Sequence, residues 1–142
     1  MSKILTQRLQ PLLPSLVSEN QYAFIKNRAI SDNVLITHEV LHYLKKSNAT
    51  KYCLMAGKTD MSKAYDRLEW NFIKEVLQWF GFHSIWNNWI MQSVTTVSYS
   101  FLINGSPRGK VVPSRGIRQG DPLSSYMFIL CGEVLSGLCH SA

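Results

Sequence analysis

The stretch Tyr52-Cys53-Leu54-Met55-Ala56-Gly57-Lys58-Thr59-Asp60-Met61-Ser62-Lys63-Ala64-Tyr65-Asp66 decides how this chain is interpreted. Its first half is an apolar run, which is typical of a buried strand, although Gly57 should weaken that strand. Asp60 ends the run, where a carboxylate meets solvent and a cation at little desolvation cost. Carboxylate oxygens suit Mg²⁺, and the nearby Lys63 suits phosphate. The alternative is that Asp60 caps the helix that follows.

The composition indicates one folded domain with a moderate positive charge. The chain has 142 residues, of which 46% are hydrophobic, and this is enough for a real core. Lys and Arg number 15 against 9 Asp and Glu, so the net charge is +6, a weak indication of a polyanionic partner. The number of cysteines is odd, and no two of them form a CxxC pair, which argues against a disulfide framework or zinc knuckle; they are Cys53, Cys131 and Cys139.

We expect no membrane partner, because no apolar run is judged long enough to span a bilayer. The N-terminal residues do not resemble a signal peptide. An intracellular location, in the nucleus or the cytoplasm, is therefore expected.

Periodicity and turn residues predict an α+β fold of several helices around a strand and a hairpin. Apolar spacing, caps and prolines place a short helix with an exit turn within 2–13, and further helices at about 31–46, 66–80, 85–94 and from 122 almost to the end. Residues 97–103 alternate in polarity, and Asn104-Gly105 then predicts a two-residue turn into a return strand ending near 112.

Apolar stripes mark the helix faces that we expect to be buried. In 31–46 the stripe is Ile36, Val40, Tyr43 and Leu44. In the last helix it is Leu123, Met127, Cys131, Val134, Leu135 and Leu138. Trp86, Trp89 and Ile90 form either a buried face of helix 85–94 or a platform for base stacking.

Two groups of cations are candidate phosphate contacts. The return strand and the loop after it carry four of them, Arg108, Lys110, Arg115 and Arg118. Lys26 and Arg28 flank a turn at Asn27 and either hold a phosphate or are solvated surface charges.

The helix at 31–46 contains the sequence His38-Glu39-Val40-Leu41-His42, which matches the H-E-x-x-H pattern of zinc peptidases. On a helix the two imidazoles would share one face. The third ligand that such a site needs is not marked by any extension of the motif, since Tyr43-Leu44-Lys45-Lys46 follows. A zinc metallopeptidase is therefore a remote alternative.

A second informative stretch is Gly116-Ile117-Arg118-Gln119-Gly120-Asp121-Pro122-Leu123-Ser124. Asp121 as N-cap and Pro122 at the first helical position announce the last helix. The two glycines allow the backbone to approach a ligand closely, and Arg118 and Gln119 are placed to reach it. The alternative is an ordinary glycine turn into a capped helix.

Taken together, residues 58–66 and 116–124 resemble the first palm motif and the following Gln-Gly motif of reverse transcriptases, most closely the LINE-type enzymes of non-LTR retrotransposons. Residues 21–42 resemble the family's fingers motif, and 101–106 its palm hairpin. The resemblance implies a right-hand polymerase fold that is only partly present here, with about 1–50 fingers-like and about 51–142 palm-like.

The resemblance also implies roles for single residues. Asp60 would be catalytic and would bind two Mg²⁺ ions, assisted by the Met61 carbonyl. Tyr65 would lie under the incoming sugar, Gln119 and Gly120 would line the nucleotide pocket, and Lys26 and Arg28 would hold the triphosphate. The implied partners are an RNA template, a DNA primer and a deoxynucleoside triphosphate.

The sequence departs from the family pattern at two important points. Lys26-Asn27 stands where a Pro-Gly turn is usual, and the aromatic-x-Asp-Asp motif does not occur within the 142 residues. That motif supplies the other metal-binding carboxylates, and the thumb follows it. We therefore expect this chain to be inactive as a polymerase by itself. A nucleic-acid-binding remnant without catalysis is the alternative function.

Overall fold

Seven helices and one two-stranded antiparallel sheet make up residues 1–48 and 54–141, the part of the chain that the computed structural model describes. Their bounds are α1 Ser2–Leu9, α2 Leu13–Leu16, α3 Ile30–Lys46, α4 Ala64–Arg67, α5 Trp70–Trp79, α6 Ser84–Thr95, β1 Tyr99–Ile103, β2 Ser106–Val111 and α7 Pro122–Ser141. The predicted mixture of helices and a hairpin is confirmed. The division into fingers and palm stays a prediction.

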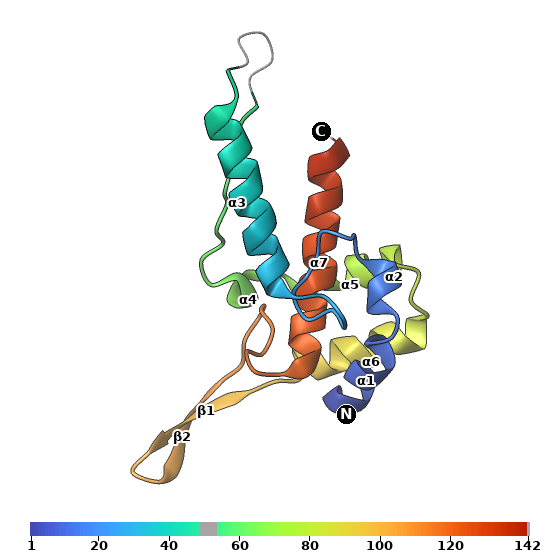
Figure 1. The fold of residues 1–142 in the computed structure, drawn as a ribbon. Coiled ribbons are helices and arrows are strands. Elements are labelled where there is room, and N and C mark those ends of the chain that lie inside the picture. The colour runs from blue at the N-terminus through green and yellow to red at the C-terminus, as the bar shows by residue number, and fades with distance from the viewer. Residues whose placement is uncertain (49–53, 142) are drawn as a thin grey trace.

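The core forms around the first half of α7. Helices α1 and α5 pack directly against α7, and α6 packs against α5 and α1 (Figure 1). The largest fully buried side chains of the core come from these helices and from α2, and they are Leu9, Leu13, Ile73, Leu77, Ile90, Met127 and Leu130. Of the face predicted for α6, Ile90 is fully buried, Trp86 is half-buried and Trp89 is 38% exposed, so the predicted burial is correct for Ile90 and wrong for Trp89.

The turn between α5 and α6 depends on Gly81, which adopts a left-handed backbone conformation. Gly81 has φ of +76°, and its N–H donates to the Gln78 carbonyl oxygen at 2.9 Å. The Phe82 N–H donates to the Leu77 carbonyl oxygen at 3.2 Å. These two bonds form a Schellman motif, which satisfies the last carbonyls of α5 and turns the chain sharply. The single helix predicted over 66–80 is in fact two, because α4 ends at Arg67 and α5 begins at Trp70.

Asp121 begins α7 as predicted. Its Oδ1 accepts a hydrogen bond from the Leu123 N–H at 3.0 Å, which satisfies one of the free donors of the first turn. The same oxygen accepts the hydroxyl of Ser2, so the cap also ties the start of α1 to the start of α7.

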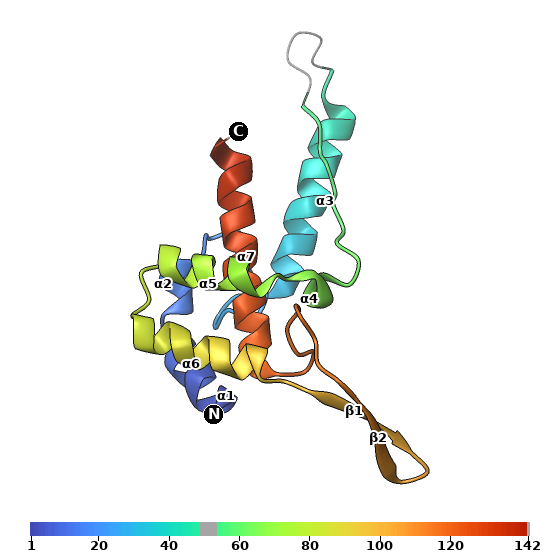
Figure 2. The ribbon, with the colours of Figure 1, turned by 180° about the vertical axis from the view of Figure 1, so that it is seen from behind.

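The far halves of two helices extend away from the core. Figures 1 and 2 show α3 and the C-terminal half of α7 projecting in the same direction beyond the packed helices. Helix α3 has no buried residue, and Val40 and Tyr43 are 47% and 62% exposed. On α7, Leu135 and Leu138 are 52% and 63% exposed, although Leu123, Met127 and Cys131 are buried. The predicted burial of the α3 stripe and of the end of α7 is therefore wrong, because spacing identifies an apolar face without supplying a neighbour to cover it.

The hairpin is confirmed, and it stands free of the core. Strands β1 and β2 pair antiparallel, and Asn104 and Gly105 turn between them with φ of +50° and +77°. Positive φ at both central residues is the geometry of a type I′ turn, which Asn-Gly favours. Every residue of both strands is exposed, and the ribbon projects from the helices (Figure 2).

The prediction of a buried strand before Asp60 is wrong for residues 54–60, the part of that segment that the structure describes. Residues 54–60 adopt no regular structure and are exposed, while Tyr52 and Cys53 lie outside the described residues. A strand needs a neighbour for its backbone groups, and the sheet that the structure describes contains β1 and β2 alone. The predicted destabilisation of this strand by Gly57 therefore does not apply, because Gly57 is not in a strand.

Helix α7 corrects one statement about membranes. It contains an 18-residue window with mean hydropathy of 1.3, so by length and composition it can cross a membrane. The prediction that no apolar segment is long enough to span a bilayer is therefore wrong. The core helix of a water-soluble domain passes the same test, and 39% of this window is buried within the fold. The expected absence of a membrane partner stays a prediction.

Candidate functional site

The two informative stretches of the sequence are held together by three hydrogen bonds. The Gly116 N–H donates to the Leu68 carbonyl oxygen at 2.7 Å, and the Ile117 N–H donates to the Tyr65 carbonyl oxygen at 2.9 Å. The Trp70 indole Nε1 donates to the Gly116 carbonyl oxygen at 2.7 Å. Residues 65–70 and 116–117, far apart in sequence, therefore form one continuous surface, which carries Tyr65 and the candidate residues of the second stretch.

Gly116 lies at the closest approach of the two segments. Its φ is +88°, and a Cβ at this position would lie 3.1 Å from both the Cα and the carbonyl oxygen of Asp66 and 3.2 Å from the carbonyl oxygen of Tyr65. Backbone atoms cannot move aside as the end of a side chain can. Glycine is therefore required here for both conformation and space.

Tyr65 lies against the first half of α7. Its ring stacks on Phe128 with centroids 5.0 Å apart and an interplanar angle of 14°. Its hydroxyl lies 3.5 Å from Ser125 Oγ. The half-buried ring is thus positioned by α7 on one side, while its backbone is positioned by the loop containing Gly116 on the other.

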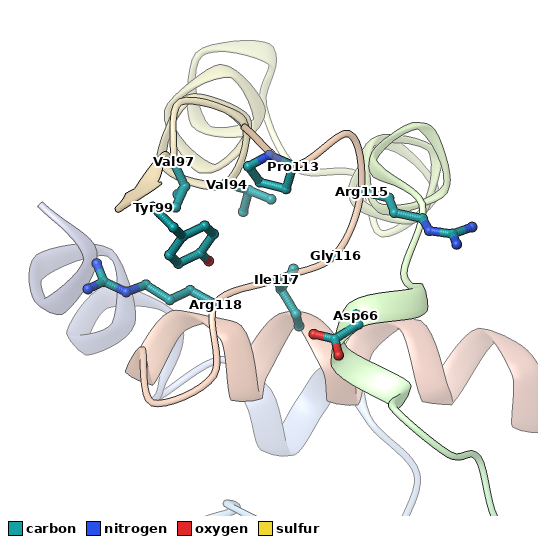
Figure 3. Close-up of a pocket in the computed structure, with 9 residues that line it drawn as sticks. All are labelled: Asp66, Val94, Val97, Tyr99, Pro113, Arg115, Gly116, Ile117 and Arg118. Atoms are coloured by element: carbon teal, nitrogen blue, oxygen red, sulfur yellow. The ribbon is translucent and has the colours of Figure 1, made fainter. Parts of the chain in front are cut away.

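A cavity of about 250 Å³ lies between this surface and the base of the hairpin (Figure 3). Val94, Val97, Pro113 and Ile117 form its apolar walls. Tyr99 points into it from the hairpin, Asp66 borders it from α4, and Arg115 and Arg118 flank it from the loop (Figure 3). The cavity therefore combines an apolar interior with an aromatic ring and charged groups at its rim.

The hairpin and the loop after it carry cations and no acidic residue, although Asp66 and Glu69 lie beside them in space. No Asp or Glu occurs between Glu75 and Asp121, whereas all four cations predicted for phosphate contact lie there. All four are exposed. Arg115 pairs with Glu69 at 3.1 Å, and both side chains are more than half exposed, so the pair contributes little stability. Within residues 1–48 and 54–141, Arg108, Lys110 and Arg118 make no ion pair.

The residues predicted to bind nucleotide are spread over several elements. Gln119 and Gly120 are exposed on the loop that leads into α7, and Gly120 has φ of +88°. Asp60 and Met61 are exposed in the irregular segment before α4. Loop 116–121 therefore joins the candidate residues of the second stretch to Tyr65, while the roles predicted for Asp60 and Met61 stay predictions.

The donor set does not fit a pair of Mg²⁺ ions. Two magnesium ions in one site need several carboxylates between them. Among the residues that the structure describes, no group of three or more His, Cys, Asp or Glu side chains is placed to hold a metal ion. The same holds for His38 and His42, which are exposed on α3.

Arg28 has a structural contact that the sequence did not indicate. Its Nη1 donates to the carbonyl oxygens of Ser18 and Gln21, each at 2.6 Å. The half-buried guanidinium thus closes the loop before α3, while Lys26 is exposed beside it. Because Nη1 is used in these two bonds, Arg28 could contact a triphosphate only through its other guanidinium N–H groups.

Three further residues shape the site without having been predicted. Trp70 and Phe128 hold the Gly116 carbonyl and the Tyr65 ring, and Ser125 lies beside the Tyr65 hydroxyl. Trp70 lies four residues after the end of the first stretch, and its closeness to that stretch was the one sequence feature that could have suggested a role. Nothing in the neighbouring residues indicated that its partner is Gly116.

Outside the site, burial raises the pKa of two side chains on α7. It raises the pKa of the Cys131 thiol to about 12, and it also raises the pKa of Tyr126.

Comparison with known proteins gives one family over the whole chain. The profile of the family described as Reverse transcriptase (RNA-dependent DNA polymerase) matches residues 1–142. The chain is 26% identical over 132 residues to an uncharacterized 149 kDa protein of transposon TX1 from Xenopus laevis, covering 93% of this chain and 10% of that protein. It is 30% identical over 110 residues to the retrovirus-related Pol polyprotein of the type-2 retrotransposable element R2DM from Drosophila melanogaster, covering 78% and 10%.

A third relative is much more similar over a shorter span. An uncharacterized mitochondrial protein of Arabidopsis thaliana is 74% identical over 42 residues, which are 30% of this chain and 34% of that protein. No solved structure matches the chain. The chain thus spans 34% of the length of the Arabidopsis protein and 10% of the length of each of the other two relatives.

Proposed function

Because the chain belongs to the reverse transcriptase (RNA-dependent DNA polymerase) family, we propose that it is part of the RNA-directed DNA polymerase of a non-LTR retrotransposon. Its similarity to the TX1 and R2 proteins supports the non-LTR assignment. In this proposal its residues contact the RNA template, the DNA primer and the incoming deoxynucleoside triphosphate. A longer polypeptide supplies the remaining parts of the polymerase.

The observation that carries this proposal is the contact between the two motif segments. Three hydrogen bonds hold Tyr65 and the Arg118-Gln119-Gly120 loop on one surface, although about fifty residues separate them in sequence. The aromatic ring is fixed by its stack on Phe128, so it offers a preorganised edge to a ligand. A nucleotide bound there would have the cations of the loop beside it.

The four exposed cations of the hairpin and the loop after it support contact with the sugar–phosphate backbone. Cations that neutralise phosphates release counterions, so affinity falls steeply as salt rises. If the four candidate cations all touch phosphates, the logarithm of the binding constant should fall with the logarithm of salt with a slope between about −3 for a single strand and about −4 for a duplex. Each lost contact should reduce that slope by about 1.

The test is a binding titration of an RNA–DNA template-primer at salt concentrations between about 50 and 200 mM. We expect steep salt dependence in the wild-type chain and a shallower slope in Arg118→Gln. Lys74→Gln on α5, which removes an exposed cation outside the hairpin and loop, is the matched control and should leave the slope unchanged. An affinity that is flat across this range, or an equal effect of both variants, would overturn the proposal.

We further propose that the 142-residue chain does not polymerise by itself. Among the described residues, no group of three or more His, Cys, Asp or Glu side chains could hold the metal pair of the family. An incomplete set of charges at such a site costs orders of magnitude in rate. Template-directed nucleotide incorporation by the purified chain, with Asp60→Ala as control, measures this directly. Incorporation that disappears in the control would refute the proposed inactivity. Salt-dependent binding without incorporation agrees with it and leaves binding as the activity of this chain alone.

A further inference from the structure

The face of the hairpin that carries Tyr99, Phe101 and Ile103 is apolar, aromatic and open to solvent. Alternation along a strand places these three side chains on one face. They are 41%, 64% and 55% exposed, respectively. A contiguous exposed apolar patch on a projecting ribbon marks an interaction surface rather than an ordinary scatter of surface residues.

The pairing register adds a cation to the same face. Phe101 lies directly opposite Arg108, and Tyr99 lies opposite Val111. Between these pairs the register shifts, so that two residues of β2 face one of β1. This bulge brings Arg108 and Val111 to the same side of the ribbon although they are three positions apart. Leu102 lies opposite Pro107 on the other face.

The charge of the surroundings selects the kind of partner. The hairpin and its flanks contain Arg108, Lys110, Arg115 and Arg118 and no acidic residue. A polyanion is attracted by this concentration of cations. Aromatic rings within a cationic groove are the combination that binds single-stranded nucleic acid, because every unpaired base offers a face for stacking.

We propose that this hairpin face, with Phe101 as its main stacking ring and Arg108 as its phosphate contact, binds single-stranded nucleic acid. The inference rests on the proposed function and specifies which strand form the basic hairpin receives. Phe101 is the more exposed of the two aromatic rings, at 64% against 41% for Tyr99, so it is the ring that a base can reach most readily. Tyr99 also lines the cavity at the base of the hairpin, which makes the face continuous with the motif surface (Figure 3).

The test compares affinities for an unstructured 12-nucleotide strand, made as RNA and as DNA, with those for an abasic strand of equal length. Loss of one stacking contact should weaken binding of the base-containing strand by about five- to 150-fold in Phe101→Ala. The abasic strand should bind wild type and Phe101→Ala equally, because both then rely on phosphate contacts. A loss with RNA alone or DNA alone would assign that strand to the hairpin and supports the proposal in either case.

Two further variants separate stacking from a change in folding. Leu102→Ala is the matched control, because it removes an exposed apolar side chain from the same strand but from the opposite face, and it should alter affinity by less than about twofold. Phe101→Trp keeps a stacking ring and should retain wild-type affinity. Equal losses in Phe101→Ala and Leu102→Ala, or no loss in Phe101→Ala with either strand, would overturn the inference.

The outcome also distinguishes this inference from the proposed function. If wild type binds with steep salt dependence but Phe101→Ala has no effect, only the stacking surface is wrong. If wild type shows no salt-dependent binding of any strand or of the template-primer, the proposed function fails as well.

Discussion

Replacing Gly116 with alanine should break the contact between the two motif segments. At φ of +88° an L-residue is strained, which costs about 1–2 kcal/mol. The new Cβ would also lie 3.1 Å from two backbone atoms of Asp66 and 3.2 Å from the Tyr65 carbonyl oxygen. Overpacking of this kind costs about 1–3 kcal/mol. We therefore expect the free energy of unfolding to fall by about 2–5 kcal/mol, a large share of the stability of a small domain.

Gly120 supplies a control with the same backbone φ. Its φ is also +88°, but a Cβ there would meet no atom within 4 Å. Gly120→Ala should therefore cost only the conformational strain, about 1–2 kcal/mol. Both substitutions reduce the entropy of the unfolded chain equally, so this contribution cancels when the variants are compared. The difference between them, about 1–3 kcal/mol, isolates the steric contact with the segment at residues 65–66.

Urea unfolding of the wild type and both variants, followed by far-UV circular dichroism, measures these differences. The reasoning requires Gly116→Ala to be clearly less stable than Gly120→Ala. Equal losses of stability would mean that the close approach at Gly116 does not exist in solution, and the candidate site would lose the contact that unites it.

Three other variants test single interactions by the same unfolding measurement. Trp70→Phe removes the indole bond to the Gly116 carbonyl oxygen and should cost about 1 kcal/mol, so unchanged stability would contradict that bond. Asp121→Ala removes the cap of α7 and should cost about 1–2 kcal/mol, whereas Asp121→Asn, which keeps an acceptor, should cost less; equal losses would show that the carboxamide oxygen cannot replace the cap. Burial raises the pKa of the Cys131 thiol from 9.0 to about 12, so its contribution is fully present below pH 9 and is lost as pH rises toward 12. The free energy of unfolding should therefore fall by up to about 1.4 kcal/mol per pH unit more in wild type than in Cys131→Ala, and identical pH profiles would contradict the buried thiol.

Local signals predicted the local structure well. Asn104-Gly105 specified the hairpin turn, because both residues tolerate positive φ. Asp121 followed by Pro122 specified the start of α7, because a side-chain acceptor and a fixed φ suit a helix N-terminus. These interactions join residues a few positions apart, so they can be recognised from the sequence.

The sequence also determined the family, because two motifs in the right order and at a suitable separation are far more specific than either alone. It identified Tyr65, Gln119 and Gly120 as candidate site residues. It did not predict that Gly116 would pack against the backbone of residues 65–66. The roles of the candidate residues with substrates still depend on the proposed experiments.

Only the tertiary structure decided which apolar segments found a neighbour. Residues 54–60 have the composition of a buried strand yet are exposed, and the stripe of α3 is exposed although its helix was predicted correctly. The same is true of the last two turns of α7, whereas its first half is buried against α1 and α5. Composition and periodicity determine whether a segment has an apolar face. Whether that face is buried depends on chain segments distant in sequence, and the joining of residues 65–70 to 116–117 depends on such contacts as well.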